Sequence, residues 1–121
     1  MKKRVLVVDD SVTMRDMVAY TMKSAGFTVF EADDGLNAID FLDKQTVDLV
    51  ITDINMPRLD GVGLIEKLRN SDINRFLPIL CLTTETDPNL KNAAKSAGAT
   101  GWLVKPFDPD VLVRAAHKVC L

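Results

Sequence analysis

The stretch VDLVITD, residues 47–53, decides the fold, because a nearly continuous apolar and β-branched run ends abruptly in an acidic residue. Runs of this kind suit strands that are buried on both faces of a parallel sheet. Residues 47–52 therefore predict one such strand. Similar runs occupy residues 5–8, 79–82 and 101–104, and a shorter, more amphipathic run occupies residues 28–32.

The segments between these runs carry apolar residues at helical spacing and polar residues on the other side, which predicts surface helices. Gly26 and Gly98 suit the left-handed turn that ends a helix, while Asp87 and Asp108 are good N-cap residues placed before a proline. The five apolar stripes are Met14, Met17, Val18, Thr21, Met22 and Ala25; Ala38, Ile39 and Leu42; Gly61, Leu64, Ile65 and Leu68; Leu90, Ala93, Ala94 and Ala97; and Leu112, Ala115, Ala116 and Val119.

Five alternating strands and helices predict an α/β fold, a doubly wound (βα)5 parallel sheet with helices on both faces. Ligands of such sheets bind outside the carboxyl ends of the strands, near the point where the strand order reverses. A chain of 121 residues suits one domain with one core. We therefore expect a single domain over residues 1–121, with no room for an output domain.

The charge balance excludes several classes of partner. With 15 basic and 17 acidic residues the net charge is −2, so no basic excess favours nucleic acid or a membrane surface. The apolar run after the first basic residues is too short for a signal peptide or a membrane span, which makes the cytoplasm the expected location. Cys81 and Cys120 lack a motif spacing; a disulfide between them stays open, but two reduced thiols fit the cytosol better.

Polar residues that follow the predicted strands meet at one edge of the sheet. Asp9 and Asp10 follow the first run, Asp53 the third, Thr83 the fourth and Lys105 the fifth. Folding does not require this arrangement, since two carboxylates ~5 Å apart at an effective dielectric of ~20 repel by roughly 3 kcal/mol. An acidic cluster that is unfavourable when empty predicts a bound cation.

A hard divalent cation suits this cluster best. Mg²⁺ prefers oxygen ligands and typically binds one or two carboxylates plus a phosphate oxygen, whereas no His or Cys lies near this edge to favour zinc or copper. Phosphoryl transfer needs mostly positioning and charge stabilisation. Lys105 and the Thr83 hydroxyl would meet the charge of an incoming phosphoryl group, and Asp53 on the central strand is the expected nucleophile.

The motifs at the strand ends also form a recognisable series. In chain order they are Asp9-Asp10, Asp53, Met56-Pro57, Asp60-Gly61, Thr83 and Lys105-Pro106. This series resembles the receiver domains of two-component response regulators, from about residue 3 to residue 119, and most of all the single-domain chemotaxis regulators. The resemblance implies a flavodoxin-like sheet with strand order 2-1-3-4-5.

The resemblance implies a role for each site residue. Asp53 would be the phosphoacceptor, Asp10 a direct Mg²⁺ ligand and Asp9 a ligand through water, with the backbone carbonyl of Asn55 as a further ligand. Lys105 would pair with the phosphoryl group.

The resemblance also implies a switch. Thr83 would report the arrival of the phosphoryl group, and the Lys105–Pro106 bond would be cis. Trp102 stands where relatives usually have Tyr or Phe as a switch aromatic, and the larger indole puts the usual inward swing of that ring in question. Asn55 and Glu85 occupy positions that tune autodephosphorylation in relatives.

Each of these residues also has a plain structural interpretation. Asp9 and Asp10 could cap the first helix, Asp53 could begin a turn, Thr83 could be another cap and Lys105 a solvated charge. Trp102 could simply pack on the sheet, and His117, the single histidine, suits a surface or packing role. These interpretations do not explain why the polar residues share one edge.

The expected function is a signalling switch rather than an enzyme acting on metabolites, although the domain would assist its own phosphorylation and dephosphorylation. The resemblance implies a sensor histidine kinase as donor, a downstream protein such as a flagellar motor switch protein as target, and a phosphatase as a further partner. A monomer is expected, without nucleic acid or membrane. The output surface would include Lys91, Lys95 and Trp102.

Other functions remain open. Within the family these are a phosphorelay intermediate or a phosphate sink. Outside it, a Mg²⁺-dependent phosphatase with an aspartyl nucleophile would need a different spacing of acids and a cap insertion. A flavin-binding module would need a phosphate loop where Asp9 and Asp10 would repel the phosphate.

Overall fold

In a computed structural model, residues 2–84 and 88–120 are described, and they form five strands that alternate with five helices. The predicted N-cap Asp87 and the tuning position Glu85 lie outside the described residues. The elements in chain order are β1 (Arg4–Val8), α1 (Val12–Ser24), β2 (Thr28–Ala32), α2 (Gly35–Lys44), β3 (Leu49–Asp53), α3 (Gly61–Arg69), β4 (Ile79–Thr83), α4 (Pro88–Ala97), β5 (Gly101–Val104) and α5 (Pro109–Val119).

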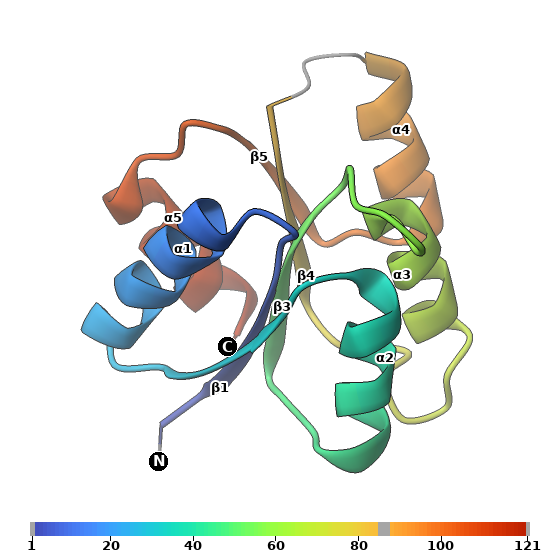
Figure 1. The fold of residues 1–121 in the computed structure, drawn as a ribbon, viewed down its shortest axis with the longest axis horizontal. Coiled ribbons are helices and arrows are strands. Elements are labelled where there is room, and N and C mark those ends of the chain that lie inside the picture. The colour runs from blue at the N-terminus through green and yellow to red at the C-terminus, as the bar shows by residue number, and fades with distance from the viewer. Residues whose placement is uncertain (1, 85–87, 121) are drawn as a thin grey trace.

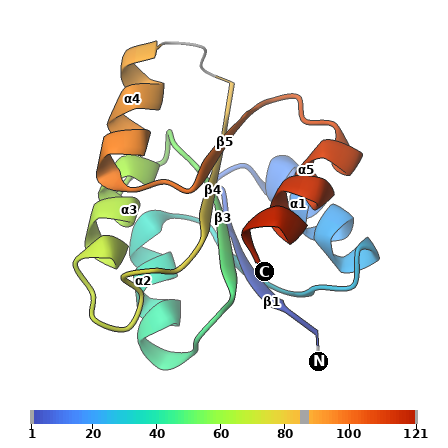
Figure 2. The same ribbon diagram turned by 180° about the vertical axis from the view of Figure 1, so that it is seen from behind.

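The strands form one parallel sheet in the order β2-β1-β3-β4-β5, which confirms the flavodoxin-like α/β fold. Helices α1 and α5 cover one face of the sheet, and α2, α3 and α4 cover the other (Figures 1 and 2). The order reverses between β1 and β3, so the carboxyl ends of these two strands lie side by side at the switch point.

Two hydrophobic clusters hold the three layers together. Alternate residues of β1 point to opposite faces: Val5 and Val7 join the cluster under α1 and α5, whereas Leu6 and Val8 join the cluster under α2, α3 and α4. All four are almost fully buried. Burial on both faces explains why the strands are continuous apolar runs, and it fixes the positions at which their ends meet solvent.

The helix signals in the sequence are largely confirmed. Gly26 and Gly98 adopt positive φ angles of 94° and 114° after α1 and α4, and Asp108 caps α5 by accepting a hydrogen bond from the backbone of Asp110. The predicted stripes are wrong at two positions: Met17 of α1 and Ala93 of α4 are exposed, and Ala19, which the α1 stripe left out, is buried.

Two strands extend one residue further than their apolar runs. Asp53 and Thr83 are the last residues of β3 and β4 rather than the residues that follow them, because their backbones still pair with Leu82 and Val104 of the neighbouring strands. β3 also begins at Leu49, later than residue 47. The site residues on these strands therefore stand on rigid backbone.

The cysteines, the histidine and the helix lengths also agree with the sequence analysis. Cys81 and Cys120 are both free thiols, and burial, with the Asp53 charge adding, raises the pKa of Cys81 to about 12. His117 lies on α5 and stacks on Phe27 with ring centroids 5.7 Å apart, which is a packing role. In the described part of the chain, every helix is too short or too polar to cross a bilayer.

Candidate functional site

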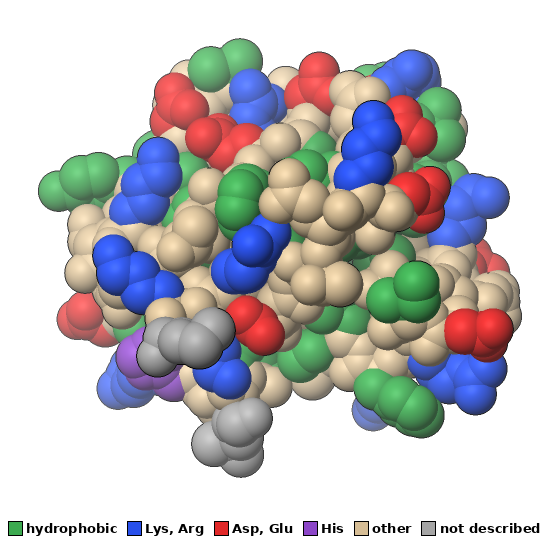
Figure 3. All heavy atoms as spheres, turned by 90° about the horizontal axis from the view of Figure 1, so that it is seen from below, with side chains coloured by type: hydrophobic (Ala, Val, Ile, Leu, Met, Phe, Trp, Pro, Cys, Tyr) green, Lys and Arg blue, Asp and Glu red, His purple; other side chains and the backbone are tan. Residues whose placement is uncertain are grey.

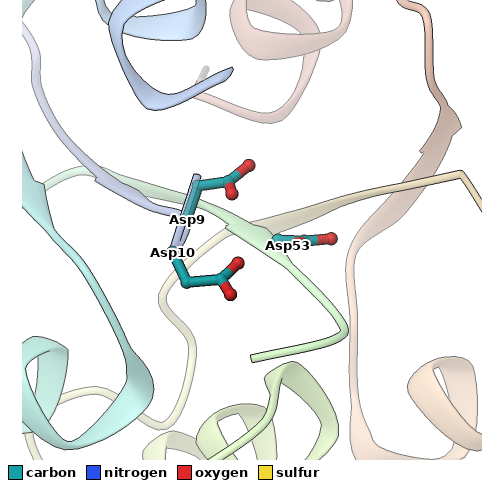
Figure 4. A group of neighbouring side chains, drawn as sticks. All are labelled: Asp9, Asp10 and Asp53. Carbon is teal, nitrogen blue, oxygen red and sulfur yellow. The ribbon is translucent and has the colours of Figure 1, made fainter. Parts of the chain in front are cut away.

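Three carboxylates gather at the carboxyl edge of the sheet, as the strand ends predict. Oxygens of Asp9, Asp10 and Asp53 all lie within 4.8 Å of one another. Asp9 and Asp10 extend from the end of β1, and Asp53 projects from the end of β3 to the same side (Figure 4). Asp9 is buried, Asp53 is half-buried and Asp10 is exposed, so the cluster opens to solvent at Asp10. This all-oxygen donor set suits a hard cation.

One cation of the chain already faces this cluster. The Lys105 ammonium lies 3.0 Å from Oδ2 of Asp9 and 3.5 Å from Oδ1 of Asp53. Its backbone N–H donates to the Thr83 carbonyl at 2.8 Å, which ties the residue after β5 to the end of β4. Within the described residues, the three acids outnumber the one ammonium that pairs with them, which leaves an excess of negative charge.

The pKa of Asp53 reflects the burial of its carboxyl group. Burial raises the pKa of the Asp53 carboxyl above its ordinary value of 3.8, since desolvation outweighs the attraction of Lys105 and the charge of Asp9 adds to the effect. The ionised form of Asp53 is therefore held in an environment that disfavours it. A group in this state gains from the approach of a further positive charge.

Asp9 is the most constrained of the three acids. Its Oδ1 accepts a hydrogen bond from the Ser11 N–H at 2.9 Å, and its backbone carbonyl accepts one from Arg15 at 2.8 Å. The helix cap is Ser11, whose hydroxyl accepts from the Met14 N–H. The capping interpretation of Asp9 and Asp10 is therefore replaced by one in which Ser11 caps α1.

Thr83 and Trp102 lie on neighbouring strands, as expected. Thr83 is fully buried, and its partner in the β4–β5 register is Val104, two residues beyond Trp102, which pairs with Cys81. The half-buried Trp102 packs against the cluster under α2, α3 and α4. Because side chains alternate along a strand, Thr83 and Trp102 face the same side of the sheet.

The loop between β3 and α3 carries Asn55 and is fixed at both ends. Ile54 and Met56 are buried on either side of the exposed Asn55. Gly61 donates its N–H to the Ile54 carbonyl at 2.8 Å, and a Cβ at Gly61 would lie 2.5 Å from the Asp53 carbonyl. Only glycine allows this close approach. After β5, the Lys105–Pro106 bond is cis, as the resemblance implies.

Sequence reasoning missed the arginines that brace this region. Arg58 adopts a φ of 67° and pairs with Asp34, and Arg15 links the Asp9 carbonyl to Glu31. At the opposite edge, Arg69 donates to backbone carbonyls of two loops. Long side chains bridge segments that are remote in sequence, so no local pattern announces their partners.

Comparison with known proteins gives the family. Residues 5–117 match the response regulator receiver domain. The chain belongs to this family. The receiver domain is 38% identical over 117 residues to the chemotaxis protein CheY-3 of Vibrio cholerae, an alignment that spans 96% of this chain and 90% of the relative.

Solved structures agree. The chemotaxis response regulator CheY4 of Vibrio cholerae is 43% identical with a TM-score of 0.92, covering 98% of this chain and 99% of that one. The receiver domain of the sensor histidine kinase PA1611 from Pseudomonas aeruginosa, crystallised with a magnesium ion in its active-site cleft, is 25% identical with a TM-score of 0.92, covering 99% of this chain and 98% of that one. This chain is thus a receiver domain of the CheY type.

Proposed function

We propose that this receiver domain is a phosphorylation-activated switch in which Asp53 accepts a phosphoryl group from a sensor histidine kinase. The observation that carries the proposal is the position of the Asp53 carboxylate, within 4.8 Å of two other acids and 3.5 Å from Lys105. Transfer would form a P–O bond at Asp53 and break the P–N bond of phosphohistidine, whose imidazole would leave and take up a proton.

The contacts of Asp53 distinguish its two oxygens. Within the described residues, Oδ1 accepts the Ile54 N–H at 2.8 Å and faces Lys105, and both contacts fix its direction. We assign Oδ2 as the attacking atom. On arrival of the phosphoryl group, the Lys105 ammonium, already within 3.5 Å, would need only a small movement to pair with the new anionic oxygens.

The donor set fits Mg²⁺. Asp10 is exposed at the mouth of the cluster and suits a direct ligand, whereas both oxygens of Asp9 already have partners in Ser11 and Lys105 and suit contact through water. Asp53 and the backbone carbonyl of Asn55 complete the set. Mg²⁺ bound there would neutralise the acids and polarise the phosphoryl oxygens. The magnesium ion in the PA1611 receiver domain supports this assignment.

The central test is to map the adduct. Incubation with a small phosphodonor and Mg²⁺ should label wild-type protein once, on Asp53, and should leave Asp53→Asn unlabelled. Asp60→Asn is a matched control, because Asp60 caps α3 by accepting the Gly63 N–H and asparagine can keep that bond. Full labelling of Asp53→Asn, with the adduct on Asp9 or Asp10, would disprove the assignment.

Asp10 provides the second test. Calorimetry should show Mg²⁺ affinity falling at least tenfold in Asp10→Ala, the loss of one anionic ligand, while the fold persists because Asp10 is exposed. An unchanged affinity would remove Asp10 from the ligand set.

For the switch itself, we propose that Thr83 moves toward the phosphoryl group and that Trp102 responds. Both face the side of the sheet covered by α4, and the single tryptophan of the chain reports this position without ambiguity. Emission and quencher access should change when Mg²⁺ and a stable phosphoryl mimic are added to wild type, and should not change in Asp53→Asn or Thr83→Ala. An equal response in all three would make Trp102 a bystander.

For output, we propose protein–protein binding in chemotaxis, through α4, β5 and α5, by a single-domain monomer in the cytoplasm. The full-length likeness to CheY-3 and CheY4 supports a motor-type target, and a phosphorelay intermediate or phosphate sink is the alternative. Pull-down with and without the phosphoryl mimic decides between them, since a flagellar motor switch protein should be retained only with the mimic.

A further inference from the structure

The loop between β3 and α3 is bound to the start of α2 by an ion pair. Arg58 Nε lies 2.6 Å from Oδ2 of Asp34, a buried carboxylate. The other oxygen of Asp34 accepts the Asn37 N–H at 2.8 Å and caps α2. Asp34 thus joins a helix terminus with one oxygen and the loop with the other, and its bond to Arg58 lowers the pKa of the carboxyl.

Backbone contact reinforces this junction. Gly35 donates its N–H to the Leu59 carbonyl at 3.2 Å, and a Cβ on Gly35 would lie 2.5 Å from that oxygen. The first residue of α2 therefore lies directly on the loop. Together, the two contacts fix residues 58 and 59, three and four positions beyond Asn55.

Arg58 has a backbone conformation that is uncommon for a residue with a side chain. Its φ of 67° lies in the left-handed region, which glycine adopts without the steric clash that a Cβ brings. An arginine at this position therefore carries a steric cost that glycine would not. The side-chain contact that the structure shows is the pair with Asp34.

We infer that Arg58 is a positioning residue for the metal site: its pair with Asp34 fixes the loop against α2 and thereby restrains the backbone at Asn55, whose carbonyl is proposed as a ligand. This inference rests on the proposed Mg²⁺ site. Ile54 and Met56 anchor the inner side of the loop, and Arg58 anchors its outer side, so Asn55 is held between two fixed points. Outer contacts of this kind commonly set the affinity of a metal site.

The sign of the effect separates positioning from simple charge. The Arg58 cation repels Mg²⁺ at long range. If this repulsion alone mattered, removing Arg58 would tighten Mg²⁺ binding. Loss of the anchor should weaken binding instead. Arg58→Gly removes the cation and the anchor together while permitting the same φ, so the variant should fold and the two explanations give opposite results.

The experiment is calorimetric titration of Mg²⁺ into wild type, Arg58→Gly, Arg58→Lys and Arg75→Gly, with thermal unfolding of each metal-free protein. Arg75→Gly is the matched control, because this exposed arginine pairs with Asp72 at 3.2 Å outside the metal loop. We expect Arg58→Gly to lose about tenfold in Mg²⁺ affinity, Arg58→Lys to recover part of the loss, and Arg75→Gly to match wild type.

A double-variant cycle completes the test. Asp34→Asn keeps the cap but removes the charge that Arg58 binds, so Asp34→Asn with Arg58→Gly should weaken Mg²⁺ binding no more than Arg58→Gly alone. Equal or tighter binding by Arg58→Gly than by wild type overturns the inference. Failure of wild type itself to bind Mg²⁺ would instead overturn the proposed function.

Discussion

The two edges of the sheet differ in how completely their charged side chains are partnered. At the carboxyl edge, three carboxylates share one ammonium, and burial raises the pKa of Asp53. At the amino edge, Arg69 donates to the carbonyls of Asn74, Arg75, Leu77 and Gly98, at 2.7 to 3.4 Å, and so ties together the loops before β4 and β5. Acidic and basic side chains are interspersed across this lower face (Figure 3).

The comparison separates a structural charge from a functional one. Arg69 is surrounded by acceptors, so its charge stabilises the fold without any ligand. The acids at the other edge outnumber the ammonium that pairs with them, and burial disfavours the ionised form of Asp53. A charge cluster that the fold leaves incomplete is the better indication of a ligand site.

The largest effect on stability should follow from removing the Arg69 guanidinium at the amino edge. Arg69→Met keeps the apolar stem but leaves several carbonyls without a donor, so we expect the free energy of unfolding to fall by about 3 kcal/mol. Urea unfolding measures this loss. Arg75→Met, at an exposed ion pair on the same loop, serves as the control and should change stability little. A loss below that of the control would mean that water replaces the bonds of Arg69.

At the carboxyl edge, we expect Mg²⁺ from solution to bind the acids and stabilise the folded protein. A ligand present at 100 times its dissociation constant stabilises the folded state by about 2.7 kcal/mol. We expect Mg²⁺ to raise the unfolding temperature of wild type accordingly, and to leave Asp53→Asn less affected. Ca²⁺-free and Mg²⁺-free buffer with matched ionic strength is the reference, because screening alone would raise both proteins equally.

Without Mg²⁺, neutralising one carboxylate at the carboxyl edge should stabilise the folded protein. Asp53→Asn removes one of the clustered charges, and we expect about 1 kcal/mol of added stability at neutral pH, since Lys105 already offsets part of the repulsion. The folded pKa of Asp53 is raised, so its ionisation destabilises the protein as pH increases from 3.8 through the folded value. The advantage of Asp53→Asn should therefore vanish in acid.

Asp34 should show the opposite and smaller dependence on pH. Arg58 lowers the folded pKa of Asp34, so the pair stabilises the protein above the unfolded value of 3.8, and this stabilisation disappears as pH falls through the folded pKa. Asp34→Asn should thus be less stable than wild type at neutral pH and equal to it in strong acid. Parallel pH profiles for the Asp34 and Asp53 variants would contradict the contrast between a carboxylate whose partner lowers its pKa and one whose burial outweighs its partner.

The sequence was most informative where chemistry follows a buried strand. Asp9, Asp10 and Asp53 could be predicted as neighbours because apolar runs fix the strand ends and parallel topology brings those ends together. Arg58 and Arg69 could not, since a long, flexible side chain selects its acceptors only in the assembled fold. Met17 was misplaced because helical periodicity does not distinguish a stripe that faces the sheet from one shifted around α1 toward solvent.

The contact between Lys105 and Asp9 joins residues that are 96 positions apart in the chain. Closing so long a loop is entropically unfavourable until the strands between them have paired. A nascent or partly unfolded chain therefore cannot bring Asp53 and Lys105 to Asp9 and Asp10. If Asp53 accepts the phosphoryl group as proposed, phosphorylation would also report that the sheet is complete from β1 to β5, because only a folded molecule brings these residues together.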